Sequence, residues 1–67
     1  MDAVAIGKRL SELRGDKTQE AVAKELGCSS SAIAMYERGE RIPRDEIKVA
    51  IAKYYGVSVQ SLFFASE

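Results

Sequence analysis

One stretch of the sequence, TQEAVAKELGCSSSAIAMYERG at residues 18–39, places two runs of helical apolar spacing on either side of a single glycine. Two helices that cross at about 90–120° through a turn of three or four residues must approach each other closely. Ala23 provides the small side chain that this approach needs, and Gly27 tolerates the backbone of the turn. The side chains expected to fill the wedge between the helices are Val22, Leu26, Ile33 and Tyr36. The spacing predicts a tight pair of crossed helices; the alternative is an ordinary helical hairpin in a small bundle.

The rest of the chain also follows a helical period. Apolar residues recur on one face of a first helix, and again in a fourth helix that follows the loop around Pro43. A short fifth helix follows Gly56. The predicted caps of the second, third and fifth helices are Thr18, Ser29 and Ser58. The predicted inner residues are Ile6, Leu10 and Leu13 in the first helix, Ile47, Ala50, Ile51 and Tyr54 in the fourth, and Leu62 and Phe63 in the fifth. We therefore expect an all-α fold of five helices in one domain, residues 1–67.

Composition excludes several classes of protein. The chain has 67 residues, no histidine and one cysteine, Cys28, so it has no internal disulfide and a structural zinc site is not expected. The carboxylates are scattered over helix faces and the cysteine has no histidine partner, which argues against an enzyme and against a cofactor. No secretory signal or membrane span is visible, and a lone cysteine fits a reducing compartment, so we expect a cytoplasmic protein. The net charge of zero counts mildly against nucleic acid, although the distribution of charge matters more.

Residues 6–63 resemble a known family. The segments IGKRLSELR, TQEAVAKELGCSSSAIAMYERGERIP and IKVAIAKYYGVSVQSLF are similar to the Cro/CI-type (XRE) helix-turn-helix regulators of phages and bacteria. The connection RGDK is about two residues shorter than the commonest form of the family. The resemblance implies a five-helix, lambda-repressor-like DNA-binding domain, with the helix-turn-helix at about residues 18–38.

The same resemblance implies a role for the second helix of the motif, which in this family lies in the major groove of DNA. The positions that correspond to the base-reading residues of the family are Ser30, Ser31, Ala34 and Met35. Serine donates to or accepts from almost any base, and alanine and methionine can touch a thymine methyl group. A simple helix-start role for Ser30 and Ser31 is the alternative.

A second set of residues is expected to hold the DNA backbone rather than read bases. Gln19 matches the glutamine that reaches a phosphate in this family, and Thr18 has a capping role as its alternative. The arginines after the recognition helix form a local basic cluster, although a solvated loop would look the same. The resemblance also pairs Arg14 with Glu37 as a structural link. The candidate positioning residues are Lys17, Thr18, Gln19, Arg38, Arg41 and Arg44.

Adjacent aromatic residues near the C-terminus suggest self-association. Phe63 and Phe64 point about 100° apart on a helix, so one is expected in the core and the other, Phe64, against a partner. We expect an isologous homodimer built on the fifth helix and the end of the fourth, with Val59, Phe64 and Tyr55 in the interface.

The sequence thus predicts a dimeric, sequence-specific regulator that binds double-stranded operator DNA, with repression favoured over activation. No small-molecule ligand is evident. A protein-binding module of the same fold, similar to an antitoxin, is the alternative, and the apolar pair Ala34 and Met35 favours it. A controller of a restriction–modification or mobile-element operon would be a third form, still acting on DNA.

Overall fold

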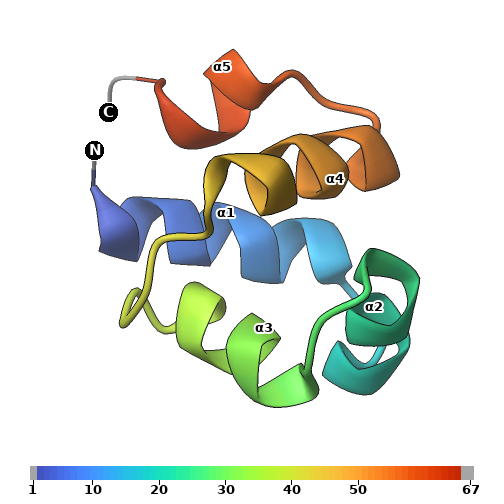
Figure 1. The fold of residues 1–67 in the computed structure, drawn as a ribbon. Coiled ribbons are helices and arrows are strands. Elements are labelled where there is room, and N and C mark those ends of the chain that lie inside the picture. The colour runs from blue at the N-terminus through green and yellow to red at the C-terminus, as the bar shows by residue number, and fades with distance from the viewer. Residues whose placement is uncertain (1, 66–67) are drawn as a thin grey trace.

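The computed structural model describes residues 2–65 and contains five helices. They are α1 (Ala3–Arg14), α2 (Gln19–Leu26), α3 (Ser30–Glu37), α4 (Asp45–Tyr55) and α5 (Val59–Phe63). No residue of this described range lies in a strand. Figure 1 shows α1 running through the middle of the molecule, with α2 and α3 on one side and α4 and α5 on the other. The predicted all-α fold of five helices is confirmed for these residues.

Local side-chain chemistry explains where most of these helices begin. Thr18 Oγ1 accepts from the N–H of Ala21 at 3.0 Å, and Ser29 Oγ accepts from the N–H of Ala32 at 3.0 Å. Ser58 does the same at the start of α5. A cap of this kind satisfies one of the N–H groups that the first turn leaves without a partner. The three predicted caps are confirmed.

The turn between α2 and α3 depends on Gly27. Its φ of 71° is left-handed, and the N–H of Cys28 reaches back to the carbonyl of Ala23 at 3.0 Å. This bond closes the end of α2 and turns the chain within two residues toward Ser29. The close crossing of α2 and α3 that the sequence predicted therefore forms at the expected place.

One core joins all five helices. Its members come from each helix and are almost inaccessible to solvent; Phe63, Ile6, Ile51 and Val22 are the largest of those that are fully buried. Leu26, Ile47 and Tyr54 are partly buried against this core. The core is small, so each of these side chains carries a large share of the stability of the fold.

Two expectations about the core were wrong. Leu13 is 37% exposed, because it lies in the last turn of α1, where it only borders a surface groove together with Val57 and Leu62. In α4 the buried residues are Lys48, Ile51 and Ala52, whereas Ala50 is only partly buried. The reason is that α5 folds over a second face of α4, which a single amphipathic stripe does not anticipate.

Candidate nucleic-acid interface

The helix α3 divides into a buried side and an open side. Ala32, Ile33 and Tyr36 are buried, while Ser31 is exposed. The other three expected base-reading residues, Ser30, Ala34 and Met35, are half-buried. Residues with the spacing 30, 31, 34 and 35 share one side of a helix. The structure therefore brings the four together on the side of α3 that does not face the core.

A glycine in α1 fixes how closely α3 approaches the rest of the molecule. A Cβ atom on Gly7 would lie 2.4 Å from the carbonyl oxygen of Glu37 and 2.7 Å from that of Tyr36. Both atoms belong to the main chain, so no side-chain movement could relieve the overlap. The main chain of α3 thus rests directly on α1 at Gly7, a contact that the sequence reasoning did not single out.

The C-terminal end of α3 is also tied to α1 by an ion pair. The guanidinium of Arg14 donates to both carboxylate oxygens of Glu37, with Nε to Oε2 at 2.7 Å and an Nη to Oε1 at 3.0 Å. The Glu37 side chain is 8% exposed. The hydrogen bond to Glu37 raises the pKa of the Arg14 guanidinium above its ordinary value. The link expected from the family resemblance is confirmed, and the short α1–α2 connection does not prevent it, since Arg14 also donates to the carbonyl of Lys17.

Gln19 joins this same carboxylate. Its Nε2 donates to Glu37 Oε1 at 3.1 Å, so the first residue of α2 is fixed to the last residue of α3. The amide oxygen and the second amide hydrogen of Gln19 remain for other partners. Gln19, Arg14 and Glu37 therefore form one network that holds the two helices of the motif and α1 in a fixed relation.

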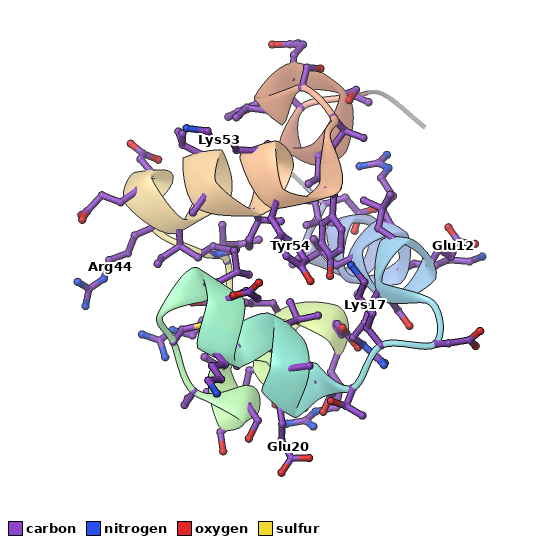
Figure 2. All side chains as sticks on the ribbon, turned by 90° about the vertical axis from the view of Figure 1, so that its right-hand side faces the viewer. Glu12, Lys17, Glu20, Arg44, Lys53 and Tyr54 are labelled. Carbon is purple, nitrogen blue, oxygen red and sulfur yellow. The ribbon has the colours of Figure 1, made fainter. Side chains whose placement is uncertain are left out.

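Lys17 takes a different direction from the one expected of a residue that contacts phosphate. Its Nζ donates to the hydroxyl of Tyr54 at 3.1 Å and lies 4.7 Å from the centre of that ring. Figure 2 shows Lys17 pointing toward Tyr54 on α4, while Glu20 points to the opposite side of the molecule. Thr18 is exposed and acts as a cap. The structure thus separates Lys17 from Gln19, although the two are close in sequence.

The loop between α3 and α4 carries the three arginines. Arg38 makes two hydrogen bonds to Glu40, at 2.8 and 3.0 Å, and this pairing lowers the pKa of Glu40. Arg41 and Arg44 are exposed and form no ion pair within residues 2–65. Figure 2 shows Arg44 extending away from the body of the molecule at the start of α4. The free positive charge of the loop is therefore concentrated on two of the three arginines.

The expected dimer residues lie on and next to α5. Phe63 is buried and Phe64 is 50% exposed, as the adjacent pair predicted. The Nζ of Lys48 lies 6.0 Å from the centre of the Phe63 ring and 5.5 Å from that of the Phe64 ring, so the charged end of this buried lysine is close to both rings. Val59 and Tyr55 are partly buried against the core of their own chain. Phe64 is thus the largest apolar side chain that this face leaves exposed.

No group of three or more potential metal ligands occurs in residues 2–65. No helix in the same range is long and apolar enough to cross a membrane.

The sequence profile of the helix-turn-helix family matches residues 8–62, which is most of the chain. This protein is a member of the Cro/CI-type (XRE) helix-turn-helix family. The family and the fold are those of DNA-binding transcriptional regulators, which are not enzymes. Membership agrees with the crossed helices, the Gln19 position and the Arg14–Glu37 link described above.

Individual relatives agree with this assignment. An uncharacterized HTH-type transcriptional regulator of Methanocaldococcus jannaschii is 39% identical over 46 residues, which cover 69% of this chain and 70% of that protein. The transcriptional repressor RstR of the cryptic phage CTXphi in Vibrio cholerae is 36% identical over 52 residues, or 78% of this chain; the match spans 47% of the length of that repressor. The crystal structure of the P22 c2 repressor with a synthetic operator superposes with a TM-score of 0.86 at 30% identity, covering 91% of this chain and 96% of that one.

Proposed function

We propose that this regulator represses transcription by binding a specific operator as a dimer, with α3 in the major groove of each half-site. The observation that carries the proposal is the open side of α3. Its four candidate reading residues, Ser30, Ser31, Ala34 and Met35, face away from the core, while the helix itself is fixed to α1 by Gly7 and by the Arg14–Glu37 pair. A short, rigidly held helix with an uncommitted face is what groove recognition requires.

The proposal divides the surface into two roles. Small side chains on α3 read base edges, so part of the specificity comes from the shape and deformability of the DNA. Gln19 and the exposed Arg41 and Arg44 hold the phosphate backbone on either side. Arg38 attracts the DNA backbone less than its charge suggests, because Glu40 already binds it. Lys17 donates to the hydroxyl of Tyr54, so it supports the position of α4 rather than contacting a phosphate directly. Thr18 serves as the cap of α2.

Dimerisation is part of the same proposal. Two-fold dimers place their recognition helices about one helical turn of DNA apart, ~34 Å. Phe64 offers the exposed apolar area that a self-complementary contact needs, and Val59 and Tyr55, both partly buried, are the other residues that we propose for the interface. The CTXphi relative is a transcriptional repressor and the P22 neighbour is a repressor bound to an operator, which supports repression by this protein. A regulator that binds operator DNA needs access to the genome, so we propose a cytoplasmic location.

A protein-binding role on the same fold is the second candidate, and the apolar Ala34 and Met35 on the open side of α3 favour it. The dependence of affinity on salt separates the two. Duplexes selected from random DNA should lose roughly 10³-fold in affinity between 50 and 200 mM salt if about six phosphates are contacted. A protein ligand bound through apolar side chains would show almost no salt dependence. Failure to select any duplex at 50 mM salt, with the protein folded, would reject the DNA proposal.

A further inference from the structure

The helix α5 is too short to keep its shape without the rest of the molecule. It has five residues, Val59–Phe63, and an isolated helix of fewer than about 12 residues is marginal in water. Its start is fixed locally, because Ser58 caps it. At its end, Phe64 stands with a φ of −121° where α2 and α4 have a left-handed glycine. The last turn of α5 therefore depends on contacts with other helices.

Arg9 of α1 provides one such contact. Its Nη1 donates to the main-chain carbonyl oxygen of Leu62 at 3.0 Å, across 53 residues of sequence. The carbonyl groups in the last turn of a helix have no partner within the helix, and an arginine near that end can bind them. The bond is partly buried, so water and salt screen it less than a surface contact. Arg9 thus caps α5 from a different helix.

Packing alone does not fill the seam between α1 and α5. A groove of about 330 Å³ lies there, and Arg9, Leu13, Val57 and Leu62 are among the residues that line it. Both partners of the hydrogen bond, Arg9 and Leu62, belong to this lining. The bond therefore joins the two helices beside an open space rather than within a filled core, where neighbouring side chains could replace it.

The last turn of α5 leads directly to Phe64, the exposed aromatic ring of the proposed dimer interface. The N–H of Phe64 donates to the carbonyl of Gln60 at 3.0 Å, so the position of Phe64 follows that of the turn before it. On the α4 side, Lys48 Nζ lies 5.5 Å from the centre of the Phe64 ring, within the range of a cation–π contact. Phe64 is therefore held twice, by Lys48 at its ring and by Arg9 through the main chain of the last turn.

Arg9 is separated from the residues that hold the recognition helix. Gly7, which supports α3, lies two positions earlier on α1, and two residues are about 200° apart around a helix. Figure 1 agrees, because α1 lies between α3 on one side and α5 on the other. We therefore expect a change at Arg9 to disturb α5 and to leave α3 in place.

We infer that Arg9 is a positioning residue for dimerisation: it holds the main chain at Leu62 and thereby places Phe64 for contact with the partner copy. The inference rests on the proposed function, which puts Phe64 in the dimer interface and α3 on DNA. Only molecules whose last turn is in place can pair. The apparent dissociation constant of the dimer therefore rises as the fraction of such molecules falls.

The first experiment measures the dimer dissociation constant of the full chain by sedimentation equilibrium. Arg9→Met keeps an unbranched stem and removes every guanidinium donor, and we expect it to weaken dimerisation roughly fivefold to tenfold. Arg9→Lys retains an ammonium donor and should show a smaller loss, so it serves the same test if Arg9→Met does not fold. Lys8→Met removes an exposed positive charge one position earlier on α1 and, as the matched control, should have no effect.

A double-mutant cycle tests whether Arg9 acts through Phe64. Phe64→Ala should weaken dimerisation by itself, because it removes the ring that contacts the partner. In that background Arg9→Met should add a loss of less than about twofold, since no ring is left to place. Fully additive losses would show that Arg9 stabilises the chain without positioning Phe64, and would overturn the inference.

DNA binding separates positioning from a general loss of structure. On a duplex with one half-site, Arg9→Met should bind as tightly as the wild type, because α3 keeps its supports at Gly7 and Arg14. On a duplex with both half-sites, it should bind less tightly, in proportion to its loss in dimerisation. Equal losses on the two duplexes would contradict the inference.

Failure of the inference and failure of the proposed function give different results. A wild-type chain that stays monomeric, both in solution and on duplexes with two half-sites, rejects the proposed dimer, and the role of Arg9 falls with it. A wild type that dimerises, together with an unchanged dimer dissociation constant in Arg9→Met, overturns the inference and leaves the proposed function intact.

Discussion

Two arginine–glutamate pairs at the end of α3 have almost the same geometry and very different surroundings. The Arg14–Glu37 pair has bonds of 2.7 and 3.0 Å, and the Arg38–Glu40 pair has bonds of 2.8 and 3.0 Å. The side chains of the first are 21% and 8% exposed, and those of the second 57% and 55%. The first pair joins α1 to α3, whereas the second closes on itself within the loop. The lengths of the hydrogen bonds therefore do not distinguish the pair that stabilises the fold. The stabilising pair is the one that is buried and that joins residues far apart in the sequence.

The difference suggests a division between two regions. The junction of α1 and α3, with Gly7 and the buried ion pair, fixes the position of the recognition helix. The loop of residues 38–44 supplies charge to a partner and contributes little to stability. If this division is correct, changes at the junction should act on folding, and changes in the loop should act on DNA affinity.

The largest effect is expected from Gly7→Ala. The added methyl group would overlap main-chain atoms of Glu37 and Tyr36, and we expect a loss of about 3 kcal/mol in the free energy of unfolding. Chemical denaturation measures it. The matched control is Gly27→Ala, which meets no atom within 4 Å but adopts a left-handed φ, and should lose only about 1 kcal/mol. Equal losses at the two positions would show that α1 and α3 do not meet as described.

The next effect is expected at the buried pair. Glu37→Gln removes the charge that binds Arg14 and weakens the acceptor of Gln19, so we expect about 2 kcal/mol of destabilisation. A double-mutant cycle with Arg14→Met measures the coupling between the two side chains. The double variant should be more stable than the sum of the single changes predicts, since it leaves no unpaired charge at the junction. Purely additive losses would mean that the pair does not hold α3.

At the exposed pair the effect should appear in binding. Glu40→Gln releases Arg38 and adds one positive charge to the loop, so we expect DNA affinity to rise severalfold at low salt. The gain should disappear near 0.5 M salt, because exposed charges are then screened over about 4 Å. Thermal unfolding should be unchanged. A fall in the unfolding midpoint as large as that of Glu37→Gln would contradict the division between junction and loop.

The smallest effects concern pH. Burial raises the pKa of Tyr55 above its ordinary value of 10.0. The neutral phenol therefore makes its full contribution to the free energy of unfolding below pH 10.0, and this contribution is lost as the pH rises through the pKa of the folded state. The hydrogen bond from Arg38 lowers the pKa of Glu40 below its ordinary value of 4.5. The charged carboxylate therefore stabilises the fold above pH 4.5, and this stabilisation is lost as the pH falls through the pKa of the folded state. Urea unfolding across both ranges should show that Tyr55→Phe reduces the alkaline loss. Glu40→Gln should alter the acid range only slightly, because that pair is exposed.

Much of the fold could be predicted from local rules. The caps Thr18, Ser29 and Ser58 and the turn at Gly27 act within a few residues, so their effects are visible in the sequence. The division of Phe63 and Phe64 between core and surface follows from helix geometry alone. These features need no knowledge of which helix packs against which.

The features that were missed depend on tertiary contacts. Leu13 has the right spacing for the core, but no helix covers the end of α1 there. Lys48 is buried because α5 closes over it, which its charge gives no reason to expect. Lys17 turns to Tyr54, 37 residues away in the sequence, and no local pattern indicates that contact. Gly7 had one available signal, since a glycine inside a helical pattern often marks a close approach of two backbones.

The most direct test of the central claim is selection of bound duplexes from random DNA by the wild-type chain, by Ser31→Ala and by Arg41→Ala. The account predicts that Ser31→Ala changes the preferred base at a defined position, whereas Arg41→Ala weakens all sequences alike and lowers the salt dependence by about one phosphate contact. The same preferred site for all variants, including changes at Ser30, Ala34 and Met35, would show that the open side of α3 does not read DNA.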